Sequence, residues 1–248
     1  MAESYFSGVA DSYSAHRPRY PEALFNWLAE ATPGHALVWE PGAGSGQASV
    51  GLAARFDHVV ATELSVEMLE RAEPHPRISY SVGVAEVSGL PDRSVDLVAV
   101  AQALHWFDFD RFHDEVRRVL VPGGVVAAWS YGVLQVQGPT VNRVFEKFYD
   151  RIASWWPPER RYVQEGYRTI PFPFEDLPHP PFQMMARWPL ASLAGYCRSW
   201  SAVVRCREAG HEDPVLALEA ELAAVWGDPN ERRIISWPLS VRAGRLPE

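Results

Sequence analysis

Two acidic residues flank a glycine-rich loop in the first third of the chain. Gly42, Gly44 and Gly46 form a G-x-G-x-G pattern, Glu40 lies two positions before it, and Glu63 follows 17 positions after it. Glycines let a ligand approach the backbone closely, and a helix that begins at the loop offers free N–H groups. Glu63 could accept hydrogen bonds from both hydroxyls of a ribose, whereas Glu40 would suit a cationic group and repel a pyrophosphate. This chemistry favours a nucleoside that lacks phosphates and carries a positive charge.

The loop differs from the dinucleotide fingerprint, and the difference bears on the ligand. The fingerprint reads G-x-G-x-x-G, whereas residue 47 is Gln. Gln47 and Glu40 therefore both disfavour a nicotinamide-dependent oxidoreductase, which is the weaker alternative. S-adenosylmethionine combines ribose, adenine, a sulfonium and an ammonium-carboxylate tail, so it matches the pattern better.

Alternating strands and helices must hold this loop. Short apolar stretches predict five strands, at residues 35–40, 58–63, 77–84, 94–103 and 125–130. Helices are expected at residues 21–32, from the glycine turn to Phe56, at 65–72 with Ser65 as N-cap, and at 108–120, and the "PGG" at 122–124 should break the chain. This alternation predicts a parallel sheet covered on both faces, with the ligand beyond the carboxyl ends of its strands.

The composition changes after residue 133. Residues 134–182 are rich in proline and aromatic residues, and we interpret them as a substrate cap, the alternative being a Pro-rich surface excursion. Aromatic side chains of this cap could line a pocket for a hydrophobic acceptor, in particular Trp155, Trp156, Tyr162 and Tyr167. Residues 183–248 are expected to complete the same domain, with strands near 182–190 and 232–243 and helices at 190–206 and 214–226. Residues 1–133 would be the S-adenosylmethionine-binding core with an N-terminal lid.

The predicted fold class is therefore α/β. We expect a Rossmann-like, doubly wound sheet of seven mostly parallel strands with helices on both faces. The cap would be an aromatic, Pro-rich helical insertion into this fold.

Further motifs extend the pattern from residue 5 to about residue 130. Ala85 and Glu86 follow the third expected strand, "LPD" at 90–92 precedes the fourth, and "Y-x-x-x-R-P-x-Y-P" spans residues 13–21. With the glycine loop, these motifs resemble the class I S-adenosylmethionine-dependent methyltransferases of the methyltransferase type 11 group. Within that group the chain is similar to the trans-aconitate methyltransferase-like small-molecule enzymes.

The resemblance implies a role for each matched position. The methionine moiety would be held by Glu40, Gly42, Ala43, Gly44, Ser45, Gly46 and Gln47. The ribose and adenine would meet Glu63, Leu64, Met68, Ala85 and Glu86. Ala101 and Gln102 would line the sulfonium, and the wall between cofactor and substrate would be formed by His105, Trp106 and Phe107. Many relatives have Asp where this chain has Val84, so the adenine amino group would meet Glu86 or a backbone carbonyl instead.

His105 and Arg17 are the candidate catalytic residues. His105 could act as a general base, and the alternative is that the "HWF" triplet packs structurally around the cofactor. Arg17 could clamp an anionic substrate in a lid with Tyr13 and Tyr20, and a plain N-terminal surface element is the alternative. Further candidates for such a clamp are Arg168, Arg198 and Arg205.

Composition limits the expected partners. The net charge is −8, and Arg117–Arg118 and Arg160–Arg161 are isolated basic pairs expected on solvated faces, so no nucleic acid partner is expected. Cys197 and Cys206 belong to no zinc-like cluster, so no metal is expected and a reducing, cytoplasmic setting is the simpler interpretation. No apolar run approaches about 18 residues, so no membrane span is expected.

The predicted function is methyl transfer to an oxygen of a small molecule. S-adenosylmethionine would be the cofactor, and a carboxylate or hydroxyl the acceptor. The alternative is a methyltransferase that acts on RNA or protein, which the acidic charge disfavours. The sequence points to no particular acceptor and to no oligomeric state.

Overall fold

A single twisted sheet organises the molecule. The computed structural model describes residues 19–246, so the predicted lid residues Tyr13 and Arg17 lie outside the described residues. The sheet follows the order β3-β2-β1-β4-β5-β9-β6, and β7 and β8 also pair with β9. The strands are β1 (Leu37–Pro41), β2 (His58–Glu63), β3 (Ile78–Val82), β4 (Val95–Ala101), β5 (Leu120–Tyr131), β6 (Gln135–Val136), β7 (Glu175–Asp176), β8 (Phe182–Trp188) and β9 (Arg233–Arg245).

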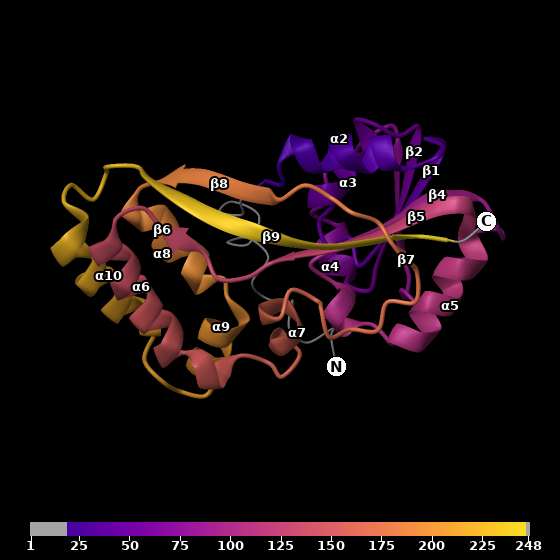
Figure 1. Ribbon diagram of the computed structural model, residues 1–248. Helices are drawn as coiled ribbons and strands as arrows, with labels where there is room; N and C mark the ends of the chain where they lie inside the picture. The colour runs from indigo at the N-terminus through magenta and orange to yellow at the C-terminus, as the bar shows by residue number, and fades with distance from the viewer. Residues whose placement is uncertain (1–18, 247–248) are drawn as a thin grey trace.

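The strand directions divide the sheet into two parts. Strands β1 to β5 pair in parallel, and β9 is antiparallel to each of its partners β5, β6, β7 and β8. The five predicted core strands and the two predicted late strands, β8 and β9, are all confirmed. The two short strands β6 and β7 go beyond the prediction. Figure 1 shows β9 running from a separate group of helices to the parallel strands.

Helices cover both faces of the parallel strands. They are α2 (Glu22–Ala31), α3 (Gln47–Ala53), α4 (Val66–Leu69), the 3-10 helix η2 (Leu104–Trp106) and α5 (Phe109–Val119). Helices α2 and α3 pack on one face and α5 on the other (Figure 1). The side chains of β4 are buried on both sides, as a central parallel strand requires. The predicted cap of α4 is confirmed, because the Met68 N–H donates to the Ser65 hydroxyl at 3.3 Å.

Two local predictions are wrong. The "PGG" does not break the chain, because β5 already pairs with β4 at Leu120 and absorbs residues 121–124 as an irregularity in the ladder. The helix expected at 190–206 is two helices, α8 (Leu190–Arg198) and α9 (Ser201–Glu208). The interruption places the Trp200 ring among the rings of Phe145, Phe148, Tyr149, Trp156 and Tyr196.

The remaining helices form a helical lobe at one end of the sheet. The lobe comprises α6 (Pro139–Arg151), the 3-10 helix η3 (Ala153–Trp155), α8, α9 and α10 (Pro214–Trp226). Its helices come from both sides of residue 182, since α10 packs against α6 and α8. Helix α7 (Arg160–Gln164) packs against η2 of the core, and its Gln164 amide donates to the Tyr149 hydroxyl of α6 at 3.3 Å. Among the described residues, no helix is long and apolar enough to span a membrane.

Candidate cofactor and acceptor site

A cavity opens at the carboxyl ends of β1, β2 and β4. It gathers the predicted cofactor residues Glu40, Gly42, Ala43, Gly44, Ser45, Gln47, Glu63, Leu64, Met68, Ala85, Glu86, Ala101, Gln102 and Trp106, and the predicted substrate residues Tyr20 and Phe107. Gly46 lines a neighbouring cavity with Ser45 and Gln47 instead. The lining also includes residues that the sequence did not single out for this site, namely Ala48, Ser65, Gly83 and Ala103.

The backbone of the glycine loop is fixed by the end of β2. The N–H groups of Gly42 and Ala43 both donate to the Thr62 carbonyl, at 2.8 and 3.1 Å. Gly42 has φ +68°, and a Cβ there would lie 2.6 Å from the Ala103 Cβ. Gly46 has φ +79°, and a Cβ there would overlap the Tyr80 hydroxyl. Glycine at these two positions is therefore required by packing and backbone conformation within the protein itself.

Glu63 lies at the end of β2 with its carboxylate oriented by two backbone groups. The Gly44 N–H donates to Oε2 at 2.9 Å, and the Ser65 N–H donates to Oε1 at 3.0 Å. A carboxylate oxygen has capacity for more than one hydrogen bond, so both oxygens can still accept from a ligand. The glycine loop and the start of α4 thus hold this acceptor pair at the cavity wall.

Glu40, in β1, is fully buried beside the loop. The Ser49 hydroxyl donates to its Oε2 at 2.5 Å, whereas its Oε1 is buried without a hydrogen-bond partner. Burial raises the pKa of Glu40 to about 8, the hydrogen bond from Ser49 opposes the rise, and the nearby charge of Glu63 adds to it. A buried oxygen without a hydrogen-bond partner is unfavourable, and a cationic donor bound in the cavity would supply the missing hydrogen bond.

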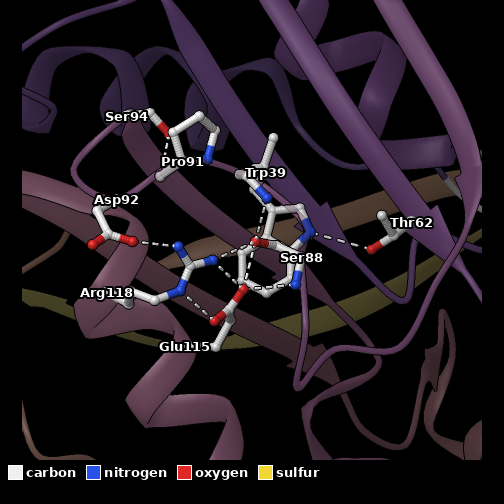
Figure 2. A network of polar contacts seen from close by, with 9 residues as sticks. Trp39, Thr62, Ser88, Pro91, Asp92, Ser94, Glu115 and Arg118 are labelled. Carbon is white, nitrogen blue, oxygen red and sulfur yellow. Dashed lines mark hydrogen bonds and ion pairs between the residues drawn. The ribbon is translucent and has the colours of Figure 1, made fainter.

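A polar network anchors the loop after β3, which carries Ala85 and Glu86. The Glu115 carboxylate accepts from the Ser88 N–H at 2.6 Å and from Arg118, and Arg118 also pairs with Asp92 (Figure 2). These hydrogen bonds, that from Arg118 first, lower the pKa of Glu115 to about 2. Arg118 therefore holds this network together from the protein surface, where its side chain is 37% exposed, as expected for a solvated face.

Glu86 links the same loop to the next element along the chain. Its Oε1 accepts a hydrogen bond from the Asp108 N–H at 2.9 Å. Asp108 in turn caps α5, since its carboxylate accepts from the Arg111 N–H at 3.2 Å. One oxygen of Glu86 is thus committed to positioning the turn that carries the "HWF" triplet.

That turn begins at Gln102, a non-glycine residue with φ +57°. The Gln102 amide bonds with the backbone of Tyr131 in both directions, donating to its carbonyl at 3.3 Å and accepting from its N–H at 3.2 Å. Sparsely populated backbone conformations of this kind concentrate at functional sites. The turn then projects Trp106 and Phe107 into the cavity lining.

His105, the third expected member of the wall with Trp106 and Phe107, contacts Tyr167 instead. Its Nδ1 lies 2.9 Å from the Tyr167 hydroxyl, and its ring packs 4.8 Å from the ring of Trp106. Burial lowers the pKa of His105 to about 3, with a further contribution from the positive charge of Arg160. His105 is not among the described residues that line the cavity. The partnership with Tyr167, 62 residues later, had no signal in the sequence.

The candidate arginines fall in different surroundings. Arg198 is engaged within the helical lobe, where it pairs with Asp213 and Glu219. Arg168 is exposed, and Arg205 is partly buried in α9. Among the described residues, no group of three or more His, Cys, Asp or Glu side chains could hold a metal ion.

Comparisons with known proteins agree with this arrangement. The model of a methyltransferase domain matches residues 39–128. A Dictyostelium discoideum protein described as a candidate methyltransferase is 33% identical over 88% of this chain and 84% of its own length. The solved structure of a candidate type II methyltransferase from Anaeromyxobacter dehalogenans is 46% identical, has a TM-score of 0.88, and covers 94% of this chain and 100% of that one.

A more distant structure shares the fold. It is an N-methyltransferase of Haemonchus contortus in complex with phosphomonomethylethanolamine and S-adenosylhomocysteine. It has a TM-score of 0.51 at 16% identity and covers 100% of this chain and 61% of that chain. At this identity the likeness concerns the fold alone.

Proposed function

The chain belongs to the class I S-adenosylmethionine-dependent methyltransferases of the type 11 group, and we propose that it methylates an oxygen, carboxylate or hydroxyl, of a small molecule. One observation carries the proposal. A single cavity joins two carboxylates, Glu40 and Glu63, to an aromatic wall formed by Tyr20, Trp106 and Phe107. The carboxylates suit a cationic nucleoside, and the wall suits a small organic acceptor. Family membership sets the nicotinamide-dependent alternative aside.

The described residues fit the cofactor. Glu40 has a buried oxygen without a partner, which the ammonium group of the methionine moiety would satisfy. Glu63 would accept hydrogen bonds from the ribose hydroxyls while its backbone contacts hold it still. Ala85 and Glu86 would meet the adenine, and Ala101 and Gln102 would lie beside the sulfonium, since all of them line the same cavity.

For methyl transfer, the main task of the protein is to align the acceptor oxygen with the methyl group. Bound S-adenosylmethionine supplies a methyl group that is already activated by the sulfonium. Trp106 and Phe107 would exclude water from the cavity, and Gln102 would keep the turn in place through Tyr131. A carboxylate acceptor needs no general base. A hydroxyl acceptor would need a base, and His105 is poorly suited to that role, because its pKa is lowered to about 3 and it is not among the described residues that line the cavity.

We extend the proposal to the domains. Residues 1–133 would bind the cofactor, residues 134–182 would form a cap on the acceptor side, and residues 183–248 would complete the domain. Support for the cap comes from α7, which packs against η2 beside the aromatic wall. The lid assigned to Tyr13 and Arg17 stays a prediction, with Tyr20 as its member in the described chain.

Cofactor binding is the first test. Calorimetry should detect S-adenosylmethionine and S-adenosylhomocysteine, and Glu63→Ala should weaken both by about 100-fold, because hydrogen bonds to a charged group are each worth about 1.5–3 kcal/mol. Glu67→Ala removes an exposed carboxylate four residues away and should change the affinity less than about twofold. Equal affinities for wild type and Glu63→Ala would contradict the assignment of Glu63.

The acceptor class is the second test. Wild type with methyl-labelled cofactor should label carboxylic acids or phenols. Mild alkali would release the label from a methyl ester and leave it on an ether. Stronger labelling of bulk RNA or of histones would favour the macromolecular alternative instead.

A further inference from the structure

Arg160 has an unusual environment for an arginine. It begins α7, the short helix that packs against η2, and its Cζ lies 4.6 Å from the centre of the Trp156 ring. Its Nε is buried and has no hydrogen-bond partner. No carboxylate of the described residues lies within ion-pair distance of its guanidinium. The expectation that Arg160 lies on a solvated face is therefore wrong, whereas its neighbour Arg161 is exposed as expected.

One group beside Arg160 is an unused hydrogen-bond donor, since Trp156 Nε1 is buried without a partner. The Ser130 hydroxyl lies instead beside the Tyr167 hydroxyl. The charge of Arg160 acts on both members of the His105–Tyr167 pair, and Tyr167 is fully buried. A partly buried cation next to an unused donor is costly unless an anion compensates it. The described chain supplies no such anion, so the cluster is suited to one from outside.

This cluster lies directly behind the aromatic wall of the cavity. His105 packs against Trp106, which lines the cavity. On the other side, Gln102 lines the cavity and holds the backbone of Tyr131, the residue after Ser130. Gln102 and Tyr167 both have positive φ, +57° and +61°, although neither is a glycine. Two strained residues on either side of His105 mark this turn as a place where local stability is given up for function.

We propose that Arg160 anchors the acceptor by pairing with a negatively charged oxygen group on it, with Trp156 as an additional donor. The inference rests on the proposed function, because it names the acceptor as an anion bound on the α7 side of that cavity. Arginine is suited to this role because its planar fork binds carboxylate and phosphate groups through two parallel hydrogen bonds. Arg160 is a substrate-anchoring residue here and takes no part in bond making.

The alternative is that Arg160 is structural and serves only to cover Trp156 through a cation–π contact. The two roles differ in a measurable way. A structural arginine would affect stability and leave the binding of anions unchanged. An anchoring arginine would affect anion binding and leave the affinity for S-adenosylhomocysteine unchanged.

The experiment compares Arg160→Met with Arg161→Met, because the adjacent Arg161 is exposed and stacks on Tyr162 in a similar cation–π contact. Benzoate, succinate and inorganic phosphate are titrated into the protein saturated with S-adenosylhomocysteine, with benzamide and succinamide as neutral matches. At least one anion should bind wild type, and Arg160→Met should weaken that binding by at least about tenfold. Arg161→Met should change it less than about twofold, and the amides should bind no better to wild type than to Arg160→Met.

The carboxylates and phosphate form separate arms that distinguish the two sources of anionic oxygen. Arg160→Lys keeps the charge without the fork, so it should recover part of the lost affinity. S-adenosylhomocysteine affinity is measured for every variant and shows that each is folded. Failure of the wild type to bind any of the anions, or equal binding by Arg160→Met, would overturn the inference. Loss of S-adenosylhomocysteine binding by wild type would instead overturn the cofactor assignment.

Discussion

The two sides of the cavity are built in different ways. On the cofactor side, backbone groups fix the geometry, since Thr62, Gly44 and Ser65 hold the glycine loop and Glu63 through main-chain contacts. On the acceptor side, side chains from separate elements meet, as His105 of η2 does with Tyr167 after α7. The cofactor side therefore depends on one continuous stretch of chain, and the acceptor side depends on how the C-terminal half packs. The difference predicts which substitutions affect which side.

The largest expected effect is a loss of stability in the helical lobe that leaves cofactor binding unchanged. Phe145 is fully buried in α6 and packs edge-on against Trp200, with ring centres 5.9 Å apart. Phe145→Ala should lower the free energy of unfolding by about 3–5 kcal/mol, because it leaves a cavity in this aromatic cluster. Urea denaturation measures that loss, and calorimetry on the folded variant should give an affinity for S-adenosylhomocysteine within about twofold of wild type.

The control for this prediction lies in the same lobe. Leu216 is exposed on α10, so Leu216→Ala should change the free energy of unfolding by less than about 0.5 kcal/mol. Phe145→Leu is a milder variant in case Phe145→Ala does not fold. A tenfold loss of cofactor affinity in a folded Phe145 variant would show instead that the packing of the helical lobe and the geometry of the cofactor side are coupled.

The contrast also explains what the sequence could predict. Glu40 and residues 42–47 are adjacent in the chain, and Glu63 ends the next strand, so residue types and spacing alone place them at one strand edge. The five parallel strands were predictable for the same reason, because strands buried on both faces appear as continuous apolar runs. Cofactor-side residues that the sequence missed, such as Gly83 and Ala103, are small lining residues without distinctive chemistry.

The acceptor side could not be predicted in this way. Arg160 and Arg161 are identical in type and adjacent in sequence, yet one is partly buried against Trp156 and the other is exposed. Only the packing of α7 on η2 distinguishes them, and no local periodicity encodes it. The split of residues 190–206 into two helices has the same origin, since the position of Trp200 depends on rings from α6 and from the segment after η3.

A smaller effect on stability is expected at the glycines, where it tests whether backbone conformation fixes the cofactor side. Gly46 and Gly89 both have positive φ, +79° and +72°, but a Cβ at residue 89 would meet nothing within 4 Å, whereas one at residue 46 would overlap Tyr80. Gly89→Ala should therefore lower the free energy of unfolding by about 1–2 kcal/mol, which is the conformational term alone. Gly46→Ala should lower it by about 1–3 kcal/mol more, because overpacking is added.

Thermal and urea unfolding of the two variants measure this difference, and Tyr80→Phe in the Gly46→Ala background should restore part of it by removing the hydroxyl. We also expect Gly46→Ala, unlike Gly89→Ala, to weaken S-adenosylhomocysteine by about tenfold through displacement of the loop. Equal stability losses at the two positions would mean that the loop can shift to accommodate a Cβ at residue 46. Its geometry would then be less fixed than its contacts suggest.

The smallest effect concerns the protonation of Glu40. In the ligand-free protein its pKa is raised to about 8, chiefly by burial, so the side chain is mostly protonated at neutral pH. Because a cationic ligand group needs the carboxylate, binding should release a proton. The affinity for S-adenosylhomocysteine should then rise by up to about tenfold per pH unit between about pH 6 and about pH 7.5. Glu40→Gln should remove this slope, whereas Glu67→Gln, an exposed control, should keep it.

The same proton affects the ligand-free protein with a definite sign. The folded state keeps the proton on Glu40 up to about pH 8, whereas the unfolded chain releases it near pH 4.5, so the free energy of unfolding falls as the pH rises between these values. His105 and His113, with pKa lowered to about 3 and about 4, act in the opposite direction, but only below about pH 6.5, where the unfolded chain binds their protons. Urea denaturation between about pH 6.5 and about pH 8 should therefore isolate Glu40, with a fall of up to about 1.4 kcal/mol per pH unit that Glu40→Gln abolishes. A flat profile in wild type would mean that Glu40 is ionised before the ligand arrives. The cofactor side would then hold a fully buried charge without a partner, as the α7 side holds the partly buried charge of Arg160, and the two sides would differ only in how they are built.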